Sequence, residues 1–133
     1  MTLHVKLVVP EGEVWAGSAE RIVAKTLDGD IGVLTGHTPV LGILAAGSVV
    51  RILPENASGG WVQAAVGGGF LSVADDQVSV LAREAALGAD VDKASTRAEL
   101  EAAIEAAAQK GQGEESPEVR YLRAMLRAAG EES

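Results

Sequence analysis

The chain changes character abruptly near Gly88. Thirteen of its sixteen glycines lie at or before this residue, together with nearly all of its β-branched residues. Beyond it, glycine becomes rare and alanine dominates. β-Branched residues favour strands, whereas alanine is the strongest helix former. The sequence therefore predicts a mainly β domain over residues 1–88 and an α-helical domain over residues 89–133.

The first part has the alternating pattern of half-buried strands. In residues 3–9, apolar side chains take every second position and leave His4 and Lys6 on the other face. Residues 20–27 repeat this alternation. Further short apolar runs, separated by turn signals, lie at residues 47–53, 61–66, 70–73 and 77–81. Many short strands at this spacing predict a β-sandwich or flattened barrel of about ten strands.

The segment after Gly88 begins with the pattern of an amphipathic helix. Asp92 is a candidate N-cap, and Thr96 with Glu99 matches a capping box. Small and apolar residues then recur at helical spacing. The predicted stripe consists of Leu100, Ala103, Ile104, Ala107 and Ala108.

Residues 116–130 predict a second helix. Ser116 is its candidate cap, Pro117 takes the first helical position, and Gly130 marks its end. A short polar linker at residues 111–116 joins the two helices into an antiparallel hairpin. Because the alanine-rich stripe buries little area, a unit of this size does not stay folded alone. The hairpin must pack on the sandwich or on another protein, and with both available it can switch between them.

Composition excludes several classes of function. The net charge of −8 leaves no overall basic footprint for a nucleic-acid backbone. The absence of cysteine excludes disulfides, thiolate metal sites and cysteine nucleophiles, and the two histidines are far apart, so we expect no metal site. The longest weakly polar run, residues 40–50, is shorter than the ~20 residues that span a membrane. Any association with a membrane therefore goes through a partner.

Two glycine-rich segments do not match nucleotide-binding loops. Residues 28–39, DGDIGVLTGHTP, lack the lysine of a P-loop and instead predict tight turns around a strand at residues 31–34. Within them, His37 is a lone histidine, for which a structural or surface role is expected. Asp30 is an acid on a rigid edge, which suits a docking contact. Residues 66–70, VGGGF, lack dinucleotide spacing and predict a bulge or a close approach of strands.

Three arginines lie on one side of the second predicted helix. Arg120, Arg123 and Arg127 are spaced i, i+3 and i+7, within about 60° on the helix circumference. One interpretation is a solvated face paired with the glutamates of the first helix, worth a few tenths of a kcal/mol per pair. The other is an arginine surface for phosphate or for an acidic partner. Spacing alone favours the solvated face.

Several stretches, taken in order, resemble one family. They are VWAGSAERI at residues 14–22, DGDIGVLTGHTPVLGIL at residues 28–44, VGGGFLSV at residues 66–73 and VSVLA at residues 78–82, followed by the helical hairpin. This combination is similar to the epsilon subunit of bacterial F-type ATP synthases, which is called delta in mitochondria. The resemblance covers nearly the whole chain.

The resemblance implies a non-catalytic rotor subunit in the central stalk of a proton-translocating ATP synthase. The family's sandwich packs on the gamma subunit and sits on the membrane-embedded c-ring. This implies a peripheral location at the cytoplasmic face of the cell membrane. Asp30 takes the place of an acidic residue close to the ring loops, with His37 nearby. The family's hairpin folds down on the sandwich or extends along gamma into the catalytic head, where it hinders ATP hydrolysis.

In the extended state, basic residues of the family's hairpin face acidic loops of the catalytic subunits, a role that Arg120, Arg123 and Arg127 match. Some family members also bind ATP between sandwich and hairpin. Asp92, Arg123 and Arg127 match that motif, but Ser95 stands where the motif has an arginine. Loss of one charge-assisted hydrogen bond weakens affinity roughly tenfold to hundredfold. We therefore expect weak or absent ATP binding and no cofactor.

The residues alone leave two other classes to compare. A free-standing β-sandwich that binds a small ligand, with a helical dimerisation tail, would run as a stable homodimer on a sizing column. An enzyme is disfavoured, because the sequence shows no nucleophile–base pair and no metal cluster.

Overall fold

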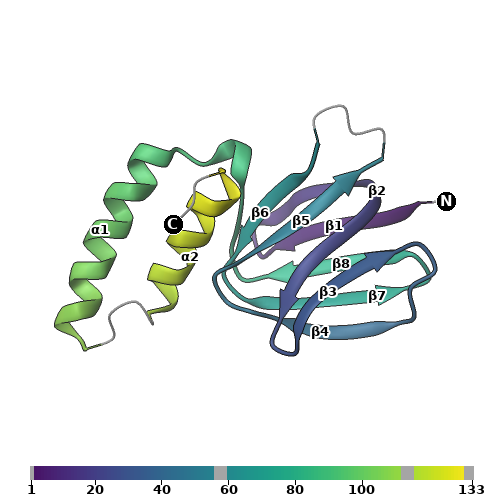
Figure 1. The fold of residues 1–133 in the computed structure, drawn as a ribbon, viewed down its shortest axis with the longest axis horizontal. Helices are drawn as coiled ribbons and strands as arrows, with labels where there is room; N and C mark the ends of the chain where they lie inside the picture. Colours follow the sequence, from purple (N-terminus) through teal and green to yellow (C-terminus); the bar gives the residue numbers. More distant parts are fainter. Residues whose placement is uncertain (1, 56–59, 112–115, 131–133) are drawn as a thin grey trace.

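A computed structural model of the chain describes residues 2–55, 60–111 and 116–130. Figure 1 shows a body of β-strands with a pair of helices beside it. The strands are β1 (Leu3–Val9), β2 (Gly12–Thr26), β3 (Gly29–Leu34), β4 (Val40–Leu44), β5 (Ser48–Pro54), β6 (Val62–Val66), β7 (Gly69–Ala74), β8 (Gln77–Ala82) and β9 (Ala85–Leu87). A 3-10 turn, η1 (Gly88–Asp90), leads into the helices α1 (Lys93–Gln109) and α2 (Pro117–Ala128). The predicted fold class, a β-sandwich followed by a two-helix hairpin, is confirmed.

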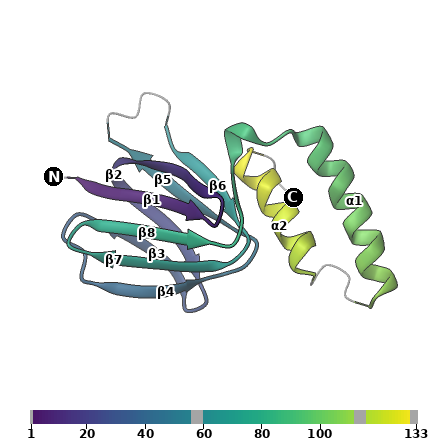
Figure 2. The same cartoon turned by 180° about the vertical axis from the view of Figure 1, so that it is seen from behind.

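Two layers of strands face each other across the core, and the long strand β2 belongs to both (Figure 2). The first half of β2 pairs with β1, and the layer continues from β1 through β8 and β7 to β4. The second half pairs with β3 and β5, followed by β6 and β9. The register on β5 shifts between Ala19 and Arg21, so an irregularity marks the point where β2 changes layer. Thr26 pairs with Leu44, which also brings the end of β2 back to the first layer.

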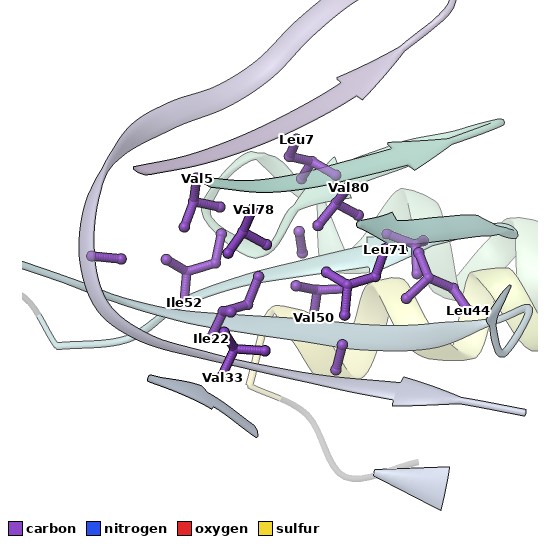
Figure 3. Packing of buried hydrophobic residues seen from close by; sticks show 14 of the residues in the cluster. Val5, Leu7, Ile22, Val33, Leu44, Val50, Ile52, Leu71, Val78 and Val80 are labelled. Carbon is purple, nitrogen blue, oxygen red and sulfur yellow. The ribbon is translucent and has the colours of Figure 1, made fainter. Parts of the chain in front are cut away.

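The core between the layers is aliphatic (Figure 3). In β1, Leu3, Val5 and Leu7 are buried while His4 and Lys6 are exposed, as the alternation predicts. Other fully buried members are Ile22, Val33, Val50, Ile52, Leu71, Val78 and Val80. Each such side chain contributes about 1.5–3 kcal/mol by burial. Aromatic residues are only 3% of the chain, so branched aliphatic side chains fill this interior.

The strands differ from the sequence-based expectation in three places. The described residues hold nine strands, and the sequence pattern predicts neither β4 nor β9. Gly42 interrupts the apolar run of β4, but a Cβ there would lie 3.1 Å from Cγ2 of Thr26, so glycine suits the close approach of β2. β2 also extends back to Gly12, because hydrogen bonding to β1 needs no apolar face. The predicted turn at residues 56–60 lies almost wholly outside the described residues.

The close approach predicted at residues 66–70 is confirmed. A Cβ atom on Gly69 would overlap the main-chain oxygen of Leu81, and Gly69 has a φ of 141°. The N–H of Gly67 donates to the main-chain oxygen of Glu84 at 2.9 Å. The glycines therefore let the β6–β7 turn lie directly against the strand and turn that follow.

Helix α1 begins as predicted at Asp92, whose side chain accepts a hydrogen bond from the N–H of Ser95 at 3.1 Å. The predicted capping box at Thr96 and Glu99 is wrong. Thr96 is buried inside the helix, and its N–H already donates to the main-chain oxygen of Asp92 at 2.9 Å. The predicted stripe is wrong at Ala108, which is exposed. Its buried members are Leu100, Ala103 and Ala107, with Ile104 half-buried.

Helix α2 lies between α1 and the strands (Figure 1). Pro117 occupies its first turn, but Ser116 makes no side-chain cap hydrogen bond. Its two buried sides are Val119, Leu122 and Leu126 against α1, and Ala124 and Ala128 against the sandwich. Gly130, with a φ of 97°, follows its end as predicted. The hairpin thus packs on the sandwich through α2, as expected for a unit that buries little area by itself.

The predicted linker at residues 111–116 lies largely outside the described residues. Among the helices that the structure describes, none is long and apolar enough to cross a membrane.

Candidate docking surfaces

A row of exposed apolar side chains crosses the outer face of one layer. Ile43 of β4 lies opposite Phe70 of β7, and Phe70 lies opposite Leu81 of β8. Leu27 extends the row, because its N–H donates to the main-chain oxygen of Ile43 at 2.9 Å. The exposed fractions are 68% for Leu27, 60% for Ile43, 41% for Phe70 and 38% for Leu81. We call these four residues the apolar row.

At the apolar row, the strands carry apolar side chains on both faces. Leu44 and Leu71, which follow Ile43 and Phe70 along their strands, point into the core and are buried. Leu41, 70% exposed, takes the next outward position of β4 and lies beside the apolar row. A contiguous group of large exposed apolar side chains marks a protein interface. Sequence reasoning missed this surface, although the run VLGIL of β4, in which only Gly42 interrupts the large apolar side chains, carried the signal.

The glycine-rich loop at residues 28–39 has the shape that its glycines predict. Gly29 and Gly36 have φ values of 118° and 84°, in the region that favours glycine. The N–H of Gly36 donates to Oδ1 of Asp76 at 2.7 Å, which ties the loop to the β7–β8 turn. The loop is therefore a braced edge of the sandwich.

The two candidate contact residues of this edge lie apart: Asp30 is exposed and His37 is half-buried. Asp30 stands opposite Lys25 in the β2–β3 pair. His37 follows the other end of β3, and its Nδ1 lies 2.6 Å from the main-chain oxygen of Thr38. Four residues of strand after Asp30 span about 13 Å. The structure therefore places Asp30 and His37 at opposite ends of β3 rather than together.

Two glycines form a seat for α2 on the sandwich. Gly47, in the β4–β5 turn, lies under Arg120 so closely that a Cβ atom at position 47 would overlap that residue. Gly88 lies in the same way against the carbonyl group of Ala128. Ala65 of β6 is fully buried beneath the helix. Small residues on both sides let the backbone of α2 approach the strands closely.

The arginines of α2 take different positions. Nη2 of Arg127 donates a hydrogen bond to the main-chain oxygen of Gly47 at 2.9 Å, while Arg120 packs over the same glycine. Arg123 is half-buried. Arg127 is exposed, as the interpretation as a solvated face expects, but its recorded hydrogen bond is to the sandwich rather than to a glutamate of α1.

The three residues matched to a nucleotide motif are engaged at different places. The carboxylate of Asp92 caps α1 through Ser95, whereas Arg127 reaches the β4–β5 turn. Arg123 sits one helical turn before Arg127. Their role in nucleotide binding stays a prediction.

A cleft of about 500 Å³ lies on the flank of α2 that faces away from Arg127, between both helices and the β8–β9 turn. Its lining includes the carboxylates of Glu84, Glu99 and Glu118, together with Arg83. Tyr121 also lines it, and burial, reinforced by the negative charge of Glu84, raises the pKa of Tyr121 to about 12. The excess of negative charge disfavours a phosphate group in this cleft. The described residues contain no group of three carboxylates, histidines or cysteines close enough to hold a metal ion.

The sandwich identifies the family. Residues 2–88 match the family model described as the beta-sandwich domain of the ATP synthase delta/epsilon chain. The chain belongs to the ATP synthase delta/epsilon family. An ATP synthase epsilon chain of Thermobifida fusca is 48% identical over 128 residues, which are 96% of this chain and 91% of the relative. Another from Prochloron didemni is 36% identical and covers 98% of both chains.

Solved structures share this delta/epsilon fold at lower identity. A chain of the Euglena gracilis mitochondrial ATP synthase aligns with a TM-score of 0.69 and 24% identity, covering 94% of this chain and 75% of its own. A chain from the central stalk and c-ring of the Tetrahymena thermophila enzyme aligns with a TM-score of 0.52 and 20% identity, covering 74% and 72%.

Membership of the delta/epsilon family confirms the resemblance seen in the sequence motifs. The relatives are epsilon chains, which are non-catalytic subunits of the ATP synthase, so the chain is a subunit rather than an enzyme. The free-standing ligand-binding module is set aside on the same ground.

Proposed function

We propose that the chain is a rotor subunit in the central stalk of a proton-translocating F-type ATP synthase, and that the apolar row docks it onto the gamma subunit. The apolar row is the single observation that carries this proposal. Four large side chains, each 38–68% exposed, lie side by side on strands whose inner faces are already buried. A surface of this kind gains free energy by being covered, and a permanent subunit interface covers it.

The comparisons support the setting of this proposal. One structural neighbour comes from a central stalk and c-ring, and the other from an assembly that contains F1 and a c-ring. We infer a peripheral position at the cytoplasmic face of the cell membrane, reached through these partners. We propose that the exposed carboxylate of Asp30 and the half-buried ring of His37 face the c-ring loops. Since they lie at opposite ends of β3, they meet the ring as two separate contacts.

The division into a docking domain (residues 1–88) and a regulatory hairpin (residues 89–133) is part of the proposal. A family member from Frankia casuarinae is 49% identical over 87 residues, which are 65% of this chain but 99% of that relative. The family model of the sandwich also covers 87 residues, 2–88. A relative of this size supports the view that the sandwich carries the assembly role and the hairpin adds regulation.

For the hairpin we propose a docked state, as seen here, and an extended state that inhibits ATP hydrolysis. In the docked state the bond to Gly47 holds Arg127 at the sandwich, away from the place where an extended hairpin would meet acidic loops of the catalytic alpha and beta subunits. Release of α2 from its seat would free Arg120, Arg123 and Arg127 for those loops. Docking and inhibition therefore compete for the same side chains.

The docking proposal is tested by binding of the purified chain to the gamma subunit. A variant with both Ile43→Ser and Phe70→Ser should lose affinity at least about tenfold. Each exposed apolar side chain contributes up to about 1.5–3 kcal/mol when covered, which corresponds to about one to two orders of magnitude in the dissociation constant. The control is Leu34→Ser, since Leu34 is 53% exposed on β3, outside the apolar row. Equal binding of the double variant and the wild type would contradict the proposal.

The regulatory proposal is tested by ATP hydrolysis in the reconstituted complex. Replacing Arg120, Arg123 and Arg127 with Ala should weaken inhibition, with Lys110→Ala as a control for a cation at the end of α1. Unchanged inhibition in the triple variant would rule out a role for these arginines. Calorimetric titration of the isolated chain with ATP should show weak or no binding, and a micromolar dissociation constant would overturn that expectation.

A further inference from the structure

A second cavity, of about 340 Å³, lies where α2 meets the sandwich, on the flank of α2 opposite to the acidic cleft. It is bounded by the outer faces of β2 and β5, by the β4–β5 turn around Gly47 and by the side chain of Arg127. Its volume is at the lower end of the range for small-molecule sites. The cavity exists in this form only while the hairpin is docked, because Arg127 closes one side.

Positive charge gathers on this cavity in a chain whose net charge is −8. Lys25 of β2, Arg51 of β5 and Arg127 of α2 line it, with Asp30 as the negative side chain of the lining. Arg51 stands opposite Val23 in the β2–β5 pair, so Lys25 is its diagonal neighbour on the same face.

The interactions recorded for these cations involve neutral groups. The guanidinium of Arg51 lies 5.7 Å from the centre of the Trp61 ring, which orients it without neutralising it. Arg127 uses one N–H on the main-chain oxygen of Gly47, and its other donors are not needed for that bond. Among the described residues, the structure records no ion pair for Lys25, Arg51 or Arg127.

We propose that this cavity binds a phosphate-type oxyanion. Three cations and one carboxylate leave an excess positive charge of two, which matches a dianion. Guanidinium groups recognise such oxygens through paired N–H donors, and lysine adds a point charge. The site is distinct from the predicted nucleotide motif, because Lys25 and Arg51 replace Asp92 and Arg123 as its polar walls.

A bound oxyanion would bridge the two parts of the chain. Lys25 and Arg51 belong to the sandwich, whereas Arg127 belongs to the hairpin. A ligand that contacts all three stabilises the docked hairpin, and by linkage a docked hairpin binds the ligand more tightly. The site thus makes docking sensitive to the concentration of the oxyanion.

The test is a titration of the full chain with inorganic phosphate at low, constant ionic strength, followed by the amide resonance of Gly47 and by the indole N–H resonance of Trp61. The expected result is saturable binding that sodium chloride at equal ionic strength does not reproduce. Lys25→Gln and Arg51→Gln should each weaken binding about tenfold or more. Asp30→Asn should strengthen it, because it removes the opposing charge. Lys6→Gln, an exposed cation on β1 in the other layer, is the matched control and should change nothing.

Titration with ATP and hydrogen exchange of α2 extend the test. Titration with ATP identifies the source of the oxyanion. If the chain binds ATP and loses this binding in Lys25→Gln and Arg51→Gln, nucleotide phosphates enter the site. If the chain binds inorganic phosphate but not ATP, the free ion is the ligand. Hydrogen exchange of α2 should slow in phosphate, and Arg127→Gln should abolish that slowing. Absence of saturable binding, or binding that the Lys25 and Arg51 variants leave unchanged, would overturn the proposal. Neither result affects gamma docking, which uses the other layer.

Discussion

Gly88 lies directly against the main-chain carbonyl of Ala128, so a Cβ atom at position 88 would overlap the carbonyl oxygen. Gly88 ends the sandwich and Ala128 ends the second helix, forty residues further along the chain. This contact, together with that of Gly47 and Arg120, decides how closely α2 can approach the strands.

The variant Gly88→Ala should loosen the docked hairpin by about 1–3 kcal/mol, the usual cost of overpacking. The sandwich should keep its stability, because Gly88 follows its last strand. Hydrogen exchange should therefore accelerate in α2 and stay unchanged in β1–β8. Gly32→Ala is the matched control, since nothing lies within 4 Å of a Cβ at that position.

The same variant separates docking from inhibition in the assembled enzyme. Gly88→Ala keeps the arginines of α2 but weakens their seat, so inhibition of ATP hydrolysis should increase, opposite to the effect of the triple arginine variant. Unchanged α2 exchange would contradict the role of Gly88 in the seat, and increased exchange without increased inhibition would contradict competition between the two states.

Gly69 should be essential to the stability of the sandwich. A Cβ at this position would overlap the main-chain oxygen of Leu81, and the φ of 141° adds backbone strain. Gly69→Ala should cost about 2–6 kcal/mol, as the sum of strain and overpacking. Gly12→Ala separates the two causes, because Gly12 has a φ of 138° but nothing within 4 Å of its added Cβ. Urea unfolding should therefore show a clearly smaller loss for Gly12→Ala, and equal losses would exclude the overlap as the cause.

The N-cap residues of the two helices should contribute differently to the stability of the hairpin. Asp92 accepts a hydrogen bond from the N–H of Ser95, so Asp92→Ala should destabilise the hairpin by about 1 kcal/mol. Ser116 makes no side-chain cap bond, so Ser116→Ala should cost less. Thermal unfolding followed by helical circular dichroism compares the two variants. A larger loss for Ser116→Ala would show that the cap assignment is wrong.

Tyr121 should make the docked hairpin sensitive to alkaline pH. Burial, together with the charge of Glu84, raises the pKa of Tyr121 from 10.0 to about 12. The neutral phenol is therefore favoured in the docked state, and its stabilisation is complete below about pH 10 and lost as the pH rises through about 12. Tyr121 is the chain's single tyrosine, so tyrosinate absorbance follows it alone. A midpoint near 10 would contradict the burial, and Tyr121→Phe should remove the alkaline weakening of the hairpin.

Local features of the sequence predicted local features of the structure. The alternation of Leu3, Val5 and Leu7, the cap at Asp92 and the glycine at position 69 each depend on residues within a few positions or on one backbone angle. Predictions failed where two local signals competed, as at Thr96, where the cap four residues earlier already starts the helix. The sequence pattern did not predict β4, because this strand is apolar on both faces and therefore shows no alternation of apolar and polar residues.

The sequence by itself determined the fold class, the family and the break near Gly88, because hydrophobic period, turn residues and motifs are written along the chain. Only the tertiary structure decided which surfaces these elements form. The apolar row joins Leu27 to Leu81 through strand register, and Arg127 meets Gly47 across 80 positions of sequence. Such contacts depend on how layers and helices pack against one another, and no local pattern encodes the distance between residues so far apart.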